Sequence, residues 1–377
     1  METPLVWIIA GESSGDAYGA ALAQALHRRS PALRLRGMGM EKMREAGVDL
    51  FADSSELGII GIVEALRHLP LFMRLMRRMV ELARQERPQT VVLIDYPGFN
   101  LRLAQRLHRL GIRIVWYVSP QVWAWKRGRI WQLARYCDRM LCIFPFEPPC
   151  YAPTTLRAEF VGHPLLGMLE PWRQRGIARA DNRILLLPGS RRMELERLMP
   201  SFLQAACILH RRHPGLRFEF ALPRPAILDY AKSLLRAAAL PADAPVFEWS
   251  VGCTRERLCG CTAALAASGT VTVEAALLGA PVVVGYKLNP LSWLIGRMLV
   301  KLPSITIANL VCGKCVFEEY LQSACTPDNL AAGIERLLIG GERREECLRG
   351  IAEFREKLGS AGEVSDNVAS AVLEAVE

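Results

Sequence analysis

An apolar run leads into a carboxylate in the stretch "VVLIDYPGFN" (91–100), where Asp95 is followed at once by a Tyr-Pro-Gly turn. Apolar runs without alternation are typical of strands covered on both faces of a parallel sheet. Ligands of open α/β sheets bind at the carboxyl ends of the strands. Asp95 is therefore placed where a side chain can meet a substrate, and three further stretches have the same layout: "IIAGESSGD", "LLLPGSRR" and "LAASGTVTVEAALLGAPVVVGY".

The stretch "AGESSGDAYGA" (10–20) follows the first apolar run and opens a helical pattern. Its small residues let a ligand approach the backbone, and a helix N-terminus offers free N–H groups. The glycine spacing is not that of the dinucleotide fingerprint, and Glu12 would repel a pyrophosphate but suits sugar hydroxyls or an amine. A substrate role is left open beside a capping role, which we expect for one of Ser13, Ser14 and Asp16.

The stretch "LLLPGSRRMELERLMP" (185–200) has the layout of a phosphate-binding loop. Gly189 and Ser190 can turn the backbone, and Arg191 then lies where a phosphate would sit. The forked guanidinium group is suited to phosphoryl oxygens. The alternative is that Arg191 and Arg192 are solvated loop charges.

The stretch "AASGTVTVEAALLGAPVVVGY" (266–286) reads as strand, small-residue turn, helix and strand. Ser268, Gly269 and Thr270 would place N–H groups and hydroxyls at a helix N-terminus, which is a site for pyrophosphate. Glu274 lies one turn further on the same face and could accept hydrogen bonds from a ribose diol. Alternatively, Thr270 caps the helix and Glu274 compensates its dipole. Together with the Gly-Ser-Arg loop, this pattern favours a nucleotide diphosphate.

Two kinds of segment combine apolar and basic residues. In "YVSPQVWAWKRGR" (117–129), Trp123 and Trp125 precede three cations, which suits single-stranded nucleic acid, sugar stacking with an anion contact, or a packed loop. Segments 61–88 and 291–303 are amphipathic and basic, so each either packs on a sheet or lies in a membrane interface. In the first, Pro70 interrupts the pattern. The candidate membrane residues there are Leu71, Phe72, Arg74, Leu75, Met76, Arg77, Arg78 and Met79.

Strand-like and helix-like runs alternate along the chain, which predicts a doubly wound α/β architecture. The chain has 377 residues, too many for one compact core. We expect an N-terminal domain over 1–172, a second domain over 173–350, and a last helix in 351–377 that packs back on one of them. The expected strands are 5–10, 90–95, 112–118, 139–144, 183–188, 217–222, 264–268 and 281–286, and the expected helices are 17–29, 99–110, 193–212, 225–239 and 270–279.

Composition limits the compartment and the partners. The net charge of +9 favours anionic partners such as nucleic acid, acidic lipid or a phosphorylated substrate. We find no signal peptide and no apolar run that could span a membrane. Eleven cysteines in such a chain indicate reduced thiols in the cytosol. "CGKC" (312–315) with Cys325 lacks a fourth ligand, so no zinc site is expected.

The ordered series of motifs resembles the lipid-A-disaccharide synthase family over residues 5 to 325. The matching stretches are "AGESSGD", "IDYPGFN", "YVSPQVWAWKRGR", "VGHPL", "LLPGSRRMELERLMP", "ASGTVTVEAALLGAPVVVGYKLNPLSW" and "IANLVCGK". The resemblance implies a glycosyltransferase of GT-B architecture, with two Rossmann-like parallel-sheet domains that face a cleft. It also implies condensation of UDP-2,3-diacylglucosamine with 2,3-diacylglucosamine 1-phosphate (lipid X), which gives a β-1,6-linked disaccharide 1-phosphate and UDP.

The resemblance also implies roles for single residues. An α-linked donor and a β-linked product require inversion, so one base must take the proton of the acceptor's 6-hydroxyl. Asp95 aligns with the family's base-type aspartate, and Glu12 and Ser14 fall on positions that matter beside it. The implied donor site consists of Gly189, Ser190, Arg191, Ser268, Gly269, Thr270, Glu274 and Asn309. Arg191 would stabilise the leaving UDP, with no metal or other cofactor.

The implied setting is the inner face of a bacterial cytoplasmic membrane, with an anionic lipid surface as partner and no nucleic acid. A homodimer is left open. The sequence departs from the family pattern at Gly98 and Gly167, where acidic residues are frequent, and His163 reads as a structural residue. The rivals are a UDP-N-acetylglucosamine 2-epimerase or another GT-B transferase, and a basic RNA- or membrane-binding protein without catalysis.

Overall fold

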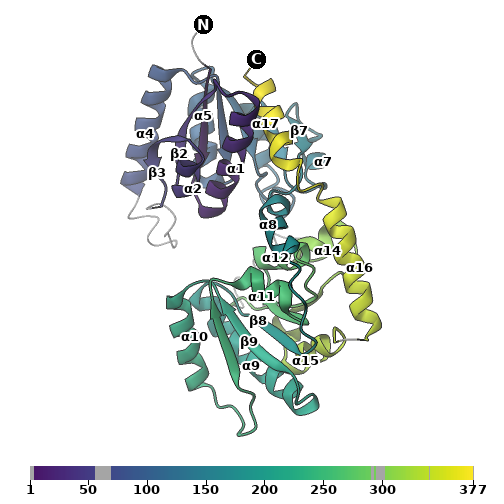
Figure 1. Cartoon of the computed structure of the whole chain (residues 1–377). Coiled ribbons are helices and arrows are strands. Elements are labelled where there is room, and N and C mark those ends of the chain that lie inside the picture. Colours follow the sequence, from purple (N-terminus) through teal and green to yellow (C-terminus); the bar gives the residue numbers. More distant parts are fainter. Residues whose placement is uncertain (1–3, 56–68, 290–292, 294–301, 339, 377) are drawn as a thin grey trace. The chain divides into compact units, whose positions relative to one another are not determined.

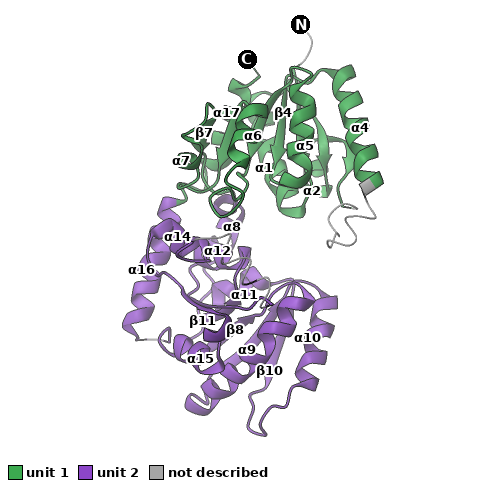
Figure 2. Cartoon of the chain, turned by 180° about the vertical axis from the view of Figure 1, so that it is seen from behind, with its two compact units in different colours: residues 1–164, 358–377 green, residues 165–357 purple. Residues whose placement is uncertain are grey.

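The computed structural model describes residues 4–55, 69–289, 293, 302–338 and 340–376. The chain divides into two compact units, of which unit 1 comprises 1–164 with 358–377 and unit 2 comprises 165–357 (Figure 2). The division expected at 172/173 falls inside α8 (Leu165–Gln174), a helix that packs on α11 and α12 of unit 2. The cleft expected between the domains stays a prediction.

Unit 1 is built on a seven-stranded sheet in the order β3-β2-β1-β4-β5-β6-β7. Its described strand pairs are all parallel. The strands are β1 (Leu5–Ala10), β2 (Arg34–Gly39), β3 (Asp49–Asp53), β4 (Thr90–Ile94), β5 (Arg113–Tyr117), β6 (Arg139–Cys142) and β7 (Arg157–Phe160). From β1 the chain builds outward to β3, then returns to the other side of β1 to form β4.

Helices cover both faces of this sheet, which explains why its central strands are apolar without alternation. Trp7 and Leu93 share one buried cluster with Met79 and Leu103 of the covering helices, whereas Gly15 lies against the opposite face. On one face, α5 packs against α4 and against α6 (Figure 2). On the other, α1 packs with α2 and α17 (Figure 1). The helices are α1 (Ser13–Arg29), α2 (Glu41–Glu45), α4 (Leu69–Glu86), α5 (Pro97–His108), α6 (Arg129–Tyr136), α7 (Pro148–Tyr151) and α17 (Val364–Glu374).

Helix α17 comes from the end of the chain and packs against α1 in unit 1. The buried Arg139 of β6 donates from Nη1 to the carbonyl of Ala371 at 2.8 Å and pairs with Glu374. Thr90 at the start of β4 donates its hydroxyl to the carbonyl of Ala375 at 2.8 Å. The sheet of unit 1 is therefore completed by a segment more than 200 positions away in the sequence.

Unit 2 repeats the design with a six-stranded sheet in the order β10-β9-β8-β11-β12-β13. Its described strand pairs are parallel as well. The strands are β8 (Arg183–Leu187), β9 (Arg217–Leu222), β10 (Phe247–Val251), β11 (Ala263–Ala267), β12 (Val282–Tyr286) and β13 (Glu318–Leu321). Beside α8, the helices are α9 (Arg192–Arg212), α10 (Pro225–Ala237), α11 (Thr254–Gly260), α12 (Thr270–Leu277), α14 (Ile307–Cys312), α15 (Pro327–Glu335), α16 (Glu342–Lys357) and the 3₁₀ turn Gln322–Ala324.

The eight apolar runs expected to be strands all form strands of the two sheets. The sequence did not predict β2, β3, β7, β10 and β13, and all of these except β2 lie at a sheet edge. An edge strand has one neighbour and more exposed side chains, so its apolar pattern is weaker. Four of the five undetected strands are therefore strands with a neighbour on one side only, and β2 is the exception.

Three further observations concern the described parts of the chain. No helix there is both long enough and apolar enough to cross a membrane. The same residues contain no group of three or more His, Cys, Asp or Glu side chains arranged to hold a metal ion. All eleven cysteines are free thiols.

Candidate active site

In each sheet the chain first adds strands on one side of the first strand and then on its other side. The predicted loops follow the two strands that meet at this switch point. In unit 1 the switch lies between β1 and β4, so the loops with Glu12 and Asp95 leave the same edge side by side. In unit 2 it lies between β8 and β11, which carry Arg191 and Ser268 in the loops that follow. Ligands of open α/β sheets bind outside the carboxyl ends of the strands at such a point.

Asp95 sits on unusual backbone directly after β4. Asp95 and Tyr96 both have left-handed backbone, with φ of 45° and 50°. Such conformations cost a non-glycine residue about 1–3 kcal/mol and cluster at functional sites. The amide of the buried Asn100 holds the turn, because its Nδ2 donates to the carbonyls of Ile94 at 3.2 Å and Asp95 at 2.8 Å. These hydrogen bonds hold the turn in its strained conformation, and the turn fixes the position of the Asp95 carboxyl.

The environment of Asp95 favours the protonated carboxyl. Loss of contact with water and, to a smaller extent, the negative charge of Glu12 together raise the pKa of Asp95 to about 6. The ring of Tyr96 lies so close to Gly11 that a Cβ there would stand 2.4 Å from it. The two loops are therefore packed together, and Gly11 is needed because any side chain would displace the ring. A carboxyl with this pKa changes charge close to neutral pH, which suits a general base.

The expectation that Ser13, Ser14 or Asp16 caps the first helix is wrong. The N-cap residue of α1 is Glu12, and no side chain caps the helix. Asp16 instead accepts hydrogen bonds from the backbone N–H groups of Met40 at 2.6 Å and Met43 at 3.2 Å. It therefore fixes the start of α2, while Ser13 and Ser14 are exposed in the first turn of α1.

Glu147 is a carboxyl near this site that the sequence did not single out. It is 1% exposed, and burial raises its pKa to about 8, with a smaller contribution from the charge of Asp95. Its Oε2 accepts from the N–H groups of Ile143 at 3.1 Å and Phe144 at 3.0 Å, and its Oε1 accepts from Nε1 of Trp123 at 3.2 Å. Glu147 closely follows β6, so a search for acids after every apolar strand would have found it.

In unit 2, the loop after β8 is turned by Gly189 and closed by Glu194. Gly189 has φ of 128°, and a Cβ there would stand 2.3 Å from the Glu194 carboxyl. That carboxyl accepts from the N–H groups of Ser190 at 2.7 Å and Arg191 at 3.3 Å. The Arg191 side chain is 78% exposed. Glu194 holds the backbone groups, and its Oε1 lies 3.8 Å from Nη1 of Arg191. The donors left for a phosphate are therefore the other N–H groups of the exposed guanidinium.

The loop after β11 offers an uncapped helix start. No side chain caps α12, whose N-cap residue is Gly269, so the alternative of a Thr270 cap is wrong. Ser268 donates its hydroxyl to the carbonyl of Ile305 at 3.4 Å. Glu274 accepts from Nε of Arg255 at 3.0 Å and from its Nη2 at 2.7 Å. Glu274 is thus already paired, and the pair leaves the other oxygen of the carboxylate for a further donor.

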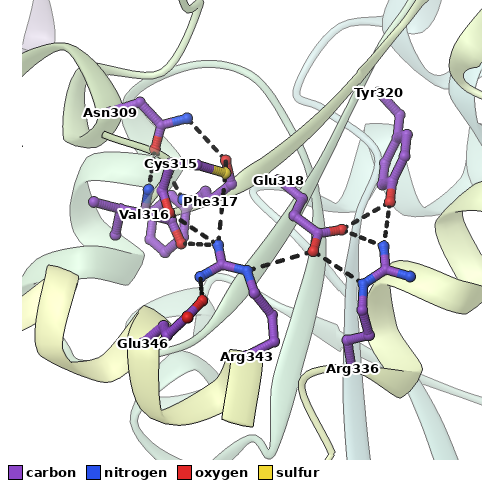
Figure 3. Close-up of polar contacts among 9 residues, drawn as sticks. All are labelled: Asn309, Cys315, Val316, Phe317, Glu318, Tyr320, Arg336, Arg343 and Glu346. Carbon is purple, nitrogen blue, oxygen red and sulfur yellow. Dashed lines mark hydrogen bonds and ion pairs between the residues drawn. The ribbon is translucent and has the colours of Figure 1, made fainter. Parts of the chain in front are cut away.

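Asn309 is buried, and its amide is fully used inside unit 2 (Figure 3). Oδ1 accepts from the N–H groups of Val316 and Phe317, both at 2.8 Å, and Nδ2 donates to the carbonyl of Phe317 at 2.8 Å and to Glu319 at 2.9 Å. Glu319 also accepts from the N–H groups of Ile305 and Thr306 at 3.0 and 2.9 Å. Asn309 therefore positions, through Glu319, the loop that Ser268 contacts.

The basic amphipathic segment forms α4, and its apolar stripe faces the protein. Met76 is 5% exposed and Met79 is 0% exposed, so the expectation that these two side chains contact a membrane is wrong. Leu71, Phe72 and Leu75 are half-buried against the same core cluster. Residues Arg74, Arg77 and Arg78 remain exposed. Residues 61–68 of this segment lie outside the described residues. So does the second amphipathic segment, 291–303, apart from Trp293, Leu302 and Pro303.

His163 is buried, and its ring centroid lies 5.1 Å from that of Phe144. Burial lowers its pKa to about 3, so the imidazole is neutral at physiological pH. These properties agree with a structural residue rather than with a proton carrier near neutral pH.

A comparison with family models matches residues 6–373 to the model described as Lipid-A-disaccharide synthetase. Among similar curated proteins, a lipid-A-disaccharide synthase of Syntrophus aciditrophicus is 39% identical over 369 residues, covering 96% of this chain and 95% of that protein. One of Koribacter versatilis is 40% identical over 379 residues, with coverage of 98% and 97%.

Two solved structures with a similar fold have low sequence identity to this chain. The glycotransferase of kitacinnamycin matches with a TM-score of 0.67 and 15% identity, over 100% of both chains. A UDP-N-acetylglucosamine 2-epimerase from Listeria monocytogenes matches with a TM-score of 0.66 and 14% identity, over 98% of this chain and 95% of that one. At this identity the likeness shows the fold, which is the GT-B architecture, and not the reaction.

Proposed function

The chain belongs to the lipid-A-disaccharide synthase family, a family of glycosyltransferases, and from this premise we propose a specific reaction for it. It transfers the sugar of UDP-2,3-diacylglucosamine to the 6-hydroxyl of 2,3-diacylglucosamine 1-phosphate, with inversion at the donor carbon. The products are the β-1,6-linked disaccharide 1-phosphate and UDP. The observation that carries the proposal is Asp95, a half-buried carboxyl with a raised pKa on constrained backbone at the switch point of unit 1.

Asp95 acts as the general base in this scheme. Its carboxylate takes the proton of the acceptor's 6-hydroxyl while that oxygen bonds to C1 of the donor sugar. The bond from C1 to the UDP oxygen breaks on the opposite face, and UDP leaves with the electron pair. Glu12 raises the pKa of Asp95 and so strengthens the base, and Ser14 of the same loop is a contact for sugar hydroxyls.

Unit 2 supplies the donor site in this scheme. Arg191 presents an exposed guanidinium to the diphosphate and stabilises the negative charge that grows on the leaving UDP. The uncapped start of α12, with Ser268, Gly269 and Thr270, offers backbone N–H groups to the same anion. Glu274 accepts from the ribose, held in place by Arg255. Since these residues provide the positive charge, the scheme uses no metal or other cofactor.

The proposed place of work is the inner face of the cytoplasmic membrane, where the acylated substrates are. Exposed Arg74, Arg77 and Arg78 on α4 support contact with an anionic lipid surface, with Met73 of the same helix 48% exposed beside them. The chain is not proposed to bind nucleic acid, because its cations are assigned to phosphorylated lipid and to UDP.

Incubation of the purified protein with the labelled donor and lipid X in detergent tests the reaction. We expect equal amounts of disaccharide 1-phosphate and UDP. Asp95→Asn should lower turnover by about 10²-fold or more while UDP still stabilises the protein thermally, since general-base removal leaves donor binding intact. The exposed Asp229→Asn serves as the matched control. Folded wild-type protein that forms neither product would overturn the proposed reaction.

A further inference from the structure

The connection between β5 and α6 begins directly beside the proposed base. Tyr117 at the end of β5 pairs in register with Ile94 at the end of β4. The N–H of Asp95 donates to the carbonyl of Tyr117 at 2.9 Å. Val118, the next residue, has φ of 71°, which a β-branched side chain rarely adopts. The chain is thus bent sharply beside Asp95 before it enters residues 121–129, which we call the tryptophan loop.

The base of the tryptophan loop is fixed to the rest of unit 1. Trp123 donates from Nε1 to the buried Glu147 at 3.2 Å, and its ring meets that of Phe146 edge to face at 5.1 Å between centroids. Just before the loop, the hydroxyls of Ser119 and Tyr151 lie 2.8 Å apart. A loop anchored in this way presents its outer residues in one geometry, which is a requirement for a specific site.

The outer part of the loop gathers cations around one aromatic ring. Trp125 is 40% exposed. Nζ of Lys126 lies 4.5 Å and Cζ of Arg129 lies 5.3 Å from the centroid of its ring. Among the described residues, neither cation forms a salt bridge with an acid. Two like charges beside one ring repel each other, so an anion bound between them would lower the electrostatic energy.

The surrounding sequence provides no acid to neutralise these cations locally. Residues 96–137 contain eight Lys or Arg and no Asp or Glu. The carboxyl that contacts the loop, Glu147, is 1% exposed and turned to Trp123 and to backbone N–H groups. The exposed charge of the loop is therefore positive, at the same sheet edge as Asp95.

We propose that the tryptophan loop is the subsite for the phosphate of the acceptor, with Lys126 and Arg129 as its ligands. The inference rests on the proposed function, in which the acceptor is a hexose 1-phosphate. A guanidinium and an ammonium group are the side chains that bind a phosphomonoester best. The diphosphate of the donor is assigned to unit 2 under the proposed function, so the anion that these two cations would bind in unit 1 is the phosphate of the acceptor. The loop thereby selects an acceptor that is phosphorylated and holds its sugar beside Asp95.

Binding measured without turnover tests this subsite even if the proposed reaction fails. The probes are short-chain 2,3-diacylglucosamine 1-phosphate and its dephosphorylated analogue. Binding of each probe is measured by quenching of tryptophan fluorescence and by calorimetry. We expect the wild type to bind the phosphorylated probe roughly tenfold tighter or more, the ratio that one charge-assisted hydrogen bond provides. The double variant Lys126→Ala, Arg129→Ala should bind both probes equally, with an unchanged melting temperature.

Arg135→Ala is the matched control, because it removes one exposed cation from α6 of the same unit without touching the Trp125 ring. It should keep the preference for the phosphorylated probe. A double variant that keeps the preference, or a control that loses it equally, would overturn the proposal. Sedimentation with anionic and zwitterionic vesicles tests whether the loop binds the phosphate of lipid headgroups instead of that of the acceptor. If only vesicle binding falls in the double variant, the loop contacts lipid headgroups and the proposed subsite is wrong.

Discussion

Asp95 is a half-buried carboxyl on left-handed backbone, next to the acid Glu12. Each of these properties lowers the stability of the fold, and none is needed to hold the sheet together. Strained backbone and perturbed pKa values persist where function requires them. At the scale of single residues, the role of Asp95 as general base therefore leads to two predictions. One concerns the pH dependence of the reaction rate, and the other concerns the stability of the folded protein.

The first prediction concerns the pH dependence of kcat/KM. Because the base must be ionised, activity should fall as the pH drops through the pKa of Asp95, which is about 6. Glu12→Gln removes a negative charge that helps to raise this pKa, so the acid limb should move to lower pH. Glu41→Gln on the surface helix α2 is the control. An acid limb that stays in place in Glu12→Gln would contradict the coupling between these loops.

The second prediction concerns the free energy of unfolding of Asp95→Asn. The folded state binds the Asp95 proton more tightly than the unfolded chain, since the pKa rises from 3.8 to about 6. The wild type therefore loses stability as the pH rises through this window. A shift of this size corresponds to roughly 3 kcal/mol.

Asparagine carries no charge, so Asp95→Asn should be more stable than the wild type above about pH 7. The difference should vanish below about pH 4, where both side chains are neutral. Urea unfolding at both pH values measures it. Equal stability at high pH would show that the carboxylate is not desolvated as the structure indicates.

Helix α4 shows how one amphipathic element can serve both packing and the surface. Its apolar stripe, with Met76 and Met79, belongs to the core of unit 1. Its opposite face presents Arg74, Arg77 and Arg78 to solvent. Sequence periodicity predicted the helix and its stripe, but the same stripe is compatible with a sheet or with a lipid surface.

The two faces of α4 should respond differently to substitution. Met76→Ser should lower the stability of unit 1 by about 2–4 kcal/mol, since a buried methionine is replaced by a small polar side chain. Met73→Ser, at a position 48% exposed, should leave the melting temperature unchanged and weaken sedimentation with anionic vesicles. The reverse pattern, in which Met76→Ser affects vesicles and not stability, would mean that the stripe faces lipid.

At the scale of the whole molecule, the chain begins unit 1 and returns to complete it after building unit 2. Helix α17 supplies partners for the buried Arg139, and its apolar residues pack on α1. Arg113 of β5 also donates to the carbonyl of Ala375, at 3.0 Å. The end of the chain is thus a structural part of the unit that carries the proposed base.

Deletion of residues 364–377 should therefore destabilise unit 1 selectively. Removing one partner of a buried charge costs about 3–5 kcal/mol, and the apolar face of α1 would be exposed as well. Hydrogen exchange should accelerate in β4, β5 and β6 and remain slow in β8 and β11. Glu374→Gln, at an exposed partner of Arg139, is the mild control. Equal exchange in both sheets of the truncated chain would contradict this assignment.

The sequence alone determined the α/β class, the central strands of both sheets and the loops at which they end. These features depend on local patterns, because a strand buried on both faces must be apolar along its length. Asp95, Glu12, Arg191 and Ser268 are candidate site residues for the same reason, since they closely follow such strands, and their roles stay predictions. The outer strands left weaker patterns, because β3, β7, β10 and β13 have a neighbour on one side only.

Only the tertiary structure decided which partner each polar side chain takes. It directed Asp16 to α2, saturated Asn309 and paired Glu274 with Arg255. It also placed Glu147 where its carboxyl accepts a hydrogen bond from Trp123. These contacts join residues distant in sequence, so no local periodicity records them. The strand ends indicated where chemistry could occur. Long-range packing then set how far each residue there is buried and which charged groups lie beside it.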